Sequence, residues 1–205
     1  GTISSADAGH VQKEMAVISL IKAFRSRGHL LANTNPVRIR KDRRPRLEIK
    51  DYSLAESDLE TEFEAGKFLG IGKAKLKTIL ETLNKIYAGH IGFEYSYIRE
   101  PEVKEWLRNK IEKEALSFQI SIDEKKQILE KLNEAVVFEN FLHTKFLGQK
   151  RFSLEGGETT IPALDAIINK AAELGTQEVM IGMAHRGRLN ILANIMGKSY
   201  EAIFD

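Results

Sequence analysis

The sequence predicts a mostly α-helical chain in which residues 1–147 form a helical region and residues 148–205 begin an α/β segment. Apolar residues up to about residue 146 recur at spacings of three and four, and no convincing pair of strands is found there. After Gly148 the order loop, helix, short apolar run, loop, helix is the one with which a parallel α/β layer begins. Since one strand cannot form a sheet, we expect the α/β part to be incomplete.

Helices are predicted at several places in the first region. Their expected positions are residues 11–29, 58–68 and 73–87, a segment that begins at Pro101, and a segment from Ser121 to about residue 146. Proline suits a first helical turn because the N–H that it lacks has no helical partner there. Ser121 is followed three residues later by Glu124, which matches a capping box. Residues 91–98 fit a short strand or an extended connection.

Two helices and one strand are predicted in the second region. One helix begins near Pro162, and the other follows residue 188. Residues 178–183, EVMIGM, form a short apolar run of the kind found in a buried strand.

The overall charge argues against a general polyanion binder. The chain has 31 Lys and Arg residues and 29 Asp and Glu residues, so its formal net charge is only +2. A nucleic-acid role would need a local patch, and the candidate is the basic run at residues 38–46 with Lys50. The run has no interleaved aromatic side chain on which a base could stack. A solvated surface loop is therefore favoured, and no nucleic-acid partner is expected.

Several other kinds of site are disfavoured. The absence of cysteine excludes disulfides, thiolate metal sites and cysteine nucleophiles. No two histidines stand at a metal-ligand spacing, and no glycine-rich nucleotide-binding motif occurs. The longest apolar stretches are far below the roughly 18 residues of a membrane span. The first residues lack the charged and apolar parts of a signal peptide, so we expect no association with a membrane.

Residues 183–188, MAHRGR, are the first candidate site. His185, Arg186 and Arg188 follow the predicted strand and precede a predicted helix, which is where ligands bind in open α/β sheets. Guanidinium groups favour an anion, and imidazole can move a proton near neutral pH. The alternative is a solvated basic turn with a histidine that is satisfied in the core.

Residues 151–157, RFSLEGG, are the second candidate site. Paired glycines allow a backbone to approach a ligand closely, and Phe152 could form the wall of a pocket. The alternative is a connecting loop whose glycines serve only the turn.

Longer stretches closely resemble the 2-oxoglutarate dehydrogenase component of the oxoglutarate dehydrogenase complex. They are residues 141–158, FLHTKFLGQKRFSLEGGE, and residues 181–194, IGMAHRGRLNILAN. Residues 25–30 (RSRGHL), 91–95 (IGFEY) and 105–107 (EWL) are similar to the early helical region of that family. The resemblance extends from about residue 11 to residue 205.

The resemblance implies an enzyme that depends on thiamine diphosphate and Mg²⁺ and decarboxylates 2-oxoglutarate. It implies that Arg151 and Phe152 border the thiamine cofactor. It also implies that His185 is the catalytic residue and, with Phe152, binds the substrate. The family holds Mg²⁺ with a Gly-Asp-Gly-like motif, and this sequence contains no Gly-Asp dipeptide, so no metal ligand is expected here. We therefore expect an N-terminal fragment that ends within the α/β thiamine diphosphate-binding domain and is inactive alone.

The resemblance also implies partners for the full-length enzyme. It would pass the succinyl unit to the lipoyl domain of the dihydrolipoyl succinyltransferase, as part of the tricarboxylic acid cycle, and it would be a homodimer. The expected location is the cytoplasm in a bacterium or the mitochondrial matrix in a eukaryote. A helical docking or dimerisation module of a multi-enzyme complex is the alternative for this chain.

Overall fold

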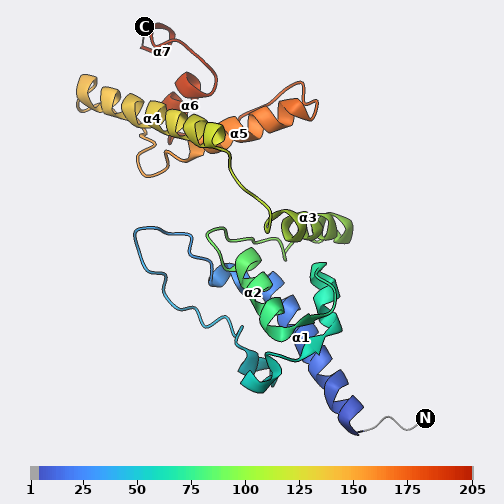
Figure 1. Ribbon diagram of the computed structural model, residues 1–205. Helices are drawn as coiled ribbons and strands as arrows, with labels where there is room; N and C mark the ends of the chain where they lie inside the picture. The colour runs from blue at the N-terminus through green and yellow to red at the C-terminus, as the bar shows by residue number, and fades with distance from the viewer. Residues whose placement is uncertain (1–4, 205) are drawn as a thin grey trace. The chain divides into compact units, whose positions relative to one another are not determined.

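The computed structural model describes residues 5–204 and separates into two compact units that divide after Phe118 (Figure 1). The first unit is Gly1–Phe118 and the second is Gln119–Asp205. Helices dominate both, which confirms the mostly α-helical class. In the described part of the chain no helix has both the length and the apolar character that a membrane crossing requires.

Three α-helices and several short elements make up the first unit. They are α1 (Ser5–Arg27), η1 (Gly28–Leu30), η2 (Ile49–Tyr52), η3 (Glu56–Asp58), β1 (Glu62–Phe63), η4 (Glu64–Leu69), β2 (Ala74–Lys75), α2 (Leu76–Tyr87) and α3 (Pro101–Glu114). The helices predicted over residues 11–29 and 73–87 and the helix start at Pro101 are confirmed. Residues 91–98 form an irregular connection.

The segment between residues 56 and 75 differs from the prediction. A single helix over residues 58–68 was expected, whereas the structure has the 3₁₀ turns η3 and η4 on either side of β1. A strand pair was not expected here, but β1 and β2 pair antiparallel, with Phe63 opposite Ala74. Strands of two residues are too short to show an alternating pattern. Their loop turns back so tightly that a Cβ on Gly66 would lie 2.3 Å from the carbonyl oxygen of Gly72.

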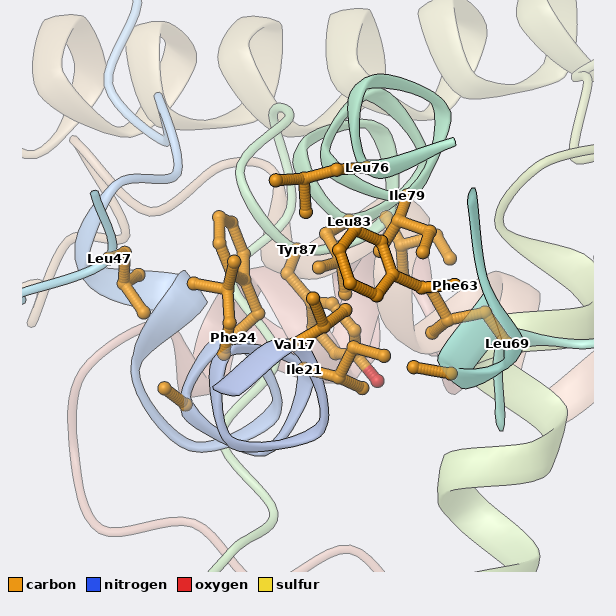
Figure 2. Close-up of a cluster of buried hydrophobic side chains, with 14 of the residues drawn as sticks. Val17, Ile21, Phe24, Leu47, Phe63, Leu69, Leu76, Ile79, Leu83 and Tyr87 are labelled. Atoms are coloured by element: carbon orange, nitrogen blue, oxygen red, sulfur yellow. The ribbon is translucent and has the colours of Figure 1, made fainter. Parts of the chain in front are cut away.

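The core of the first unit lies between α1 and α2 (Figure 2). Apolar side chains at spacings of three and four give each helix one buried face. The residues of these faces that lie in the core include Val17, Ile21 and Phe24 of α1 and Leu76, Ile79, Leu83 and Tyr87 of α2. Phe63 of β1 is fully buried in the same cluster, so the small strand pair closes one end of the core.

A buried polar network joins α1, α2 and α3. Arg25 donates two hydrogen bonds to the carboxylate of Glu112, from Nε at 2.6 Å and from Nη2 at 2.9 Å. The Tyr87 hydroxyl donates to the same carboxylate at 2.6 Å and lies 3.1 Å from the Tyr95 hydroxyl. Burial and the bond to Glu112 raise the pKa of Tyr87. Burial lowers the pKa of Arg25, but the interactions with Glu112 outweigh it and raise the pKa overall.

The second unit contains α4 (Ile122–Lys145), α5 (Thr160–Glu173), α6 (Arg188–Asn194) and α7 (Glu201–Phe204). The predicted capping box opens α4: Ser121 Oγ accepts from the N–H of Glu124 at 3.2 Å, and Glu124 Oε2 accepts from the N–H of Ser121 at 2.7 Å. The helices expected near Pro162 and after residue 188 are also present. A small apolar cluster holds the unit together; its buried members are Ala135, Leu154, Ile161 and Ile191.

The strand predicted over residues 178–183 is absent from the described structure. These residues are irregular, and the Met180 side chain is 99% exposed. A strand exists only through ladder hydrogen bonds to a neighbour, and no described strand lies in this unit. The start of an α/β domain is therefore not visible here, and a change of class at residue 148 stays a prediction.

We predict that Glu112→Ala lowers the free energy of unfolding of the first unit by about 3 kcal/mol. The change leaves the largely buried Arg25 charge and the Tyr87 hydroxyl without their shared acceptor. Urea unfolding followed by the fluorescence of Trp106, which lies on α3, measures the loss. Glu105→Ala, on the same helix, removes an exposed ion pair with Arg108 and should cost about 0.5 kcal/mol or less. Equal losses for the two variants would contradict the role of the network.

Candidate functional site

The two candidate segments meet in the second unit. The rings of Phe152 and His185 lie 4.8 Å apart between centroids and are tilted by 40°. The guanidinium carbon of Arg188 lies 5.4 Å from the centre of the Phe152 ring. Phe152 therefore lies at the centre of a small cluster with His185 and Arg188, which are more than 30 residues further along the chain.

Two hydrogen bonds to backbone carbonyls join these segments. The N–H of Gly187 donates to the carbonyl of Phe152 at 2.7 Å, and Arg186 Nη1 donates to the carbonyl of Ser153 at 2.7 Å. Gly187 has a φ of +76°, and a Cβ there would lie 2.6 Å from Leu154 Cδ1. A glycine is needed at this position both for its backbone conformation and for the close approach to Leu154.

Phe152 has an unusual backbone conformation for an aromatic residue. Its φ of +49° lies in the left-handed region, which costs energy for a bulky side chain and is found often at functional sites. Its side chain is still 37% exposed, and His185 is exposed as well. The conformation therefore presents the ring pair to solvent, where a ligand can reach it.

Arg151 makes its contacts with α4. Its Nη2 lies 3.0 Å from His143 Nδ1, and its Nη1 donates to the carbonyl of Glu139 at 3.4 Å. No hydrogen bond joins Arg151 to His185 in the described structure. The structure therefore brings Phe152 and His185 together, while the guanidinium of Arg151 contacts the adjoining helix.

Two buried polar residues beneath the ring pair have no part in the sequence-based prediction. Glu139 of α4 is 3% exposed, and Asn190 of α6 is fully buried. Both belong to helices whose polar positions normally face solvent, so periodicity gives no sign that they are buried. His143 of α4 contacts Arg151.

The charges around the ring pair suit an anion. Arg186 and Arg188 follow His185 in the chain, and Arg151 precedes Phe152. Guanidinium groups bind carboxylate and phosphate oxygens with paired hydrogen bonds. These side chains and the exposed Phe152 ring suit a ligand that carries anionic groups. The described residues contain no group of three or more His, Cys, Asp or Glu side chains that could hold a metal ion.

The basic run at residues 38–46 is an irregular, mostly exposed segment. The guanidinium of Arg40 binds the end of the preceding helical segment: its Nη1 donates to the carbonyls of His29 and Ala32 at 2.9 and 2.6 Å. The prediction of a surface loop is confirmed.

We predict that Gly187→Ala destabilises the second unit by about 1–3 kcal/mol. The added Cβ overlaps Leu154 and is strained at a positive φ. Amide hydrogen exchange in α5 and α6 measures the change. Gly182→Ala is the matched control, because a Cβ there meets no atom within 4 Å. Protection as high in the Gly187 variant as in the control would show that the turn tolerates a side chain.

No family model matches the chain. It is 50% identical over 195 residues to the multifunctional 2-oxoglutarate metabolism enzyme of Mycolicibacterium vanbaalenii, which covers 94% of this chain and 16% of that protein. It is 48% identical over 195 residues to the enzyme of the same name from Mycobacterium sp. strain JLS, covering 94% of this chain and 15% of that protein. It is 44% identical over 200 residues to the 2-oxoglutarate dehydrogenase E1/E2 component of Corynebacterium glutamicum, covering 95% of this chain and 16% of that protein.

These similarities cover nearly all of the chain, which spans about one sixth of the length of these relatives. The resemblance to the 2-oxoglutarate dehydrogenase family, expected from the two long motifs, is thereby confirmed.

Proposed function

We propose that this chain is part of a thiamine diphosphate-dependent 2-oxoglutarate dehydrogenase and forms one side of its active centre. The observation that carries the proposal is the contact between Phe152 and His185, which unites the two motifs of the family resemblance in one exposed, cationic cluster. The names of the relatives support 2-oxoglutarate as the substrate.

The side chains have distinct roles in this proposal. His185, which is exposed, donates a hydrogen bond to a carboxylate of 2-oxoglutarate or to the oxygen that gains negative charge during the reaction. Phe152 forms an apolar wall that orients the substrate and limits the access of water. Arg151 borders the cofactor, and the bond to His143 fixes its guanidinium. Thiamine diphosphate, when bound, supplies the electron sink for the loss of CO₂ from a 2-oxo acid.

The ligands of Mg²⁺ would come from another part of the enzyme. This ion needs oxygen ligands in near-octahedral geometry, and the described residues offer no such cluster. We therefore propose that the chain contacts the organic cofactor and the substrate but does not ligate the metal ion. By itself it would have no turnover.

The remaining steps concern the whole enzyme. We propose transfer of the succinyl unit to the lipoyl domain of a dihydrolipoyl succinyltransferase, in the tricarboxylic acid cycle, by a homodimer. We propose neither a nucleic-acid partner nor a membrane location. The compartment would be the bacterial cytoplasm or the mitochondrial matrix.

A second candidate function for the first unit is docking or dimerisation. A groove of about 640 Å³ lies between the end of α2, residues 89–93 and α3. Its lining includes Phe118 and Ile91, whose side chains are more than half exposed. Sedimentation of the chain and of Phe118→Asp distinguishes the cases: loss of a dimer in the variant supports docking between copies, and a monomer in both removes it.

We predict that His185→Ala lowers kcat/KM for 2-oxoglutarate by about 10²-fold or more, because the substrate loses a positioned donor. The measurement uses the full-length polypeptide that contains this chain, with CO₂ release as the readout. His10→Ala is the control, since this exposed histidine lies on α1 in the first unit. A kcat/KM equal to that of the control would remove His185 from the active centre.

A further inference from the structure

One oxygen of a buried carboxylate joins three segments of the second unit. Glu139 Oε1 accepts a hydrogen bond from the N–H of Leu154 at 3.0 Å and another from Asn190 Nδ2 at 3.1 Å. Glu139 lies on α4, Leu154 in the loop that carries Phe152, and Asn190 on the helix that follows His185. The two halves of the ring pair are therefore connected through a single acceptor.

Asn190 completes this connection. Its Nδ2 also donates to the carbonyl of Ala135 at 3.0 Å, and its Oδ1 accepts from Asn194 Nδ2 at 2.7 Å. Every polar atom of this fully buried amide is therefore paired. Such a side chain has one orientation available, which fixes α6 against α4 and, through Glu139, against the loop.

Two further hydrogen bonds join this loop to the segment of His185: the N–H of Gly187 donates to the carbonyl of Phe152, and Arg186 Nη1 donates to the carbonyl of Ser153. Leu154 is the only residue of the loop over residues 151–157 in the buried apolar cluster, which has four members. The N–H of Leu154 donates the hydrogen bond to Glu139. Leu154 lies two residues after the strained Phe152. A polar contact next to the strained residue is well placed to hold it in its unfavourable conformation.

We infer that Glu139 is a positioning residue, which acts together with these two hydrogen bonds to hold Phe152 against His185. The length of its side chain is what matters, because it brings one oxygen to the place where the donors of the loop and of α6 converge. The other oxygen, Oε2, is buried without a hydrogen-bond partner among the described residues. An amide at this position therefore keeps both contacts, whereas a shorter carboxylate cannot make them.

Three substitutions at Glu139 distinguish the effect of side-chain length from the effect of the negative charge. Glu139→Gln keeps the acceptor in place and should retain the ring contact. Glu139→Asp keeps the carboxylate but withdraws it by one methylene, and Glu139→Ala removes it, so both should lose the contact. Glu130→Ala, which removes an exposed glutamate of the same helix, is the matched control.

Nuclear Overhauser effects between the Phe152 and His185 ring protons, measured in the 205-residue chain, report the contact directly. We expect them in the unchanged chain, Glu130→Ala and Glu139→Gln, and we expect their loss in Glu139→Asp. Retention in a Glu139→Asp variant that keeps the amide protection of α5 would overturn the inference, as would loss in Glu139→Gln. If Glu139→Ala does not fold, the Asp and Gln variants still decide the question.

The consequence for turnover rests on the proposed function. In the full-length enzyme Glu139→Asp should lower kcat/KM for 2-oxoglutarate by about 10- to 100-fold, with Glu139→Gln within about twofold of the unchanged enzyme. Loss of the ring contact without any loss of turnover would remove the ring pair from the proposed active centre and leave the positioning role of Glu139 intact. Retention of the contact in Glu139→Asp would overturn the positioning role while the His185 test still stands.

Discussion

The hydrogen bonds that converge on Glu139 join the three segments from which the candidate site is built. The second unit has a small apolar core, with Ala135, Leu154, Ile161 and Ile191 as its buried members. Apolar packing is non-directional, so a core of this size gives stability without fixing the orientation of a loop. Directed contacts from a fully buried amide and a carboxylate supply that orientation.

The first unit uses a buried carboxylate in a different setting. Its apolar core is much larger and draws on α1, α2 and the small strand pair. Glu112 therefore adds a polar cross-link between helices that apolar side chains already hold together. Removing a partner from such a network is costly because it leaves a buried charge without compensation, whereas the complete network adds little net stability over an apolar replacement. The same chemical group thus stabilises helix packing in one unit and orients a loop in the other.

Local signals predicted most of the α-helices because their causes lie within the helices, whereas the helix expected over residues 58–68 was wrong. The stripe of α2, Pro101 at the first turn of α3 and the Ser121 capping box each depend on residues at most a few positions apart. The strand expected over residues 178–183 depends on a neighbouring strand, which no local pattern supplies. The same distinction explains the site. His185 and Phe152 were identified from the motifs, but the carboxylate of Glu139 beneath them was not, since burial of a helical glutamate follows only from tertiary packing.

The charge distribution of the cluster also indicates what an active centre built on it would need. Arg188 and His185 lie against the Phe152 ring, and Arg186 is bonded to the loop that carries Phe152. A carboxylate or a diphosphate bound beside them is stabilised by donors on that side alone. In the proposed enzyme the oxygen ligands of a divalent ion would come from another part of the protein. Guanidinium groups of this chain and a metal ion bound elsewhere would then both offset the negative charge of the ligand.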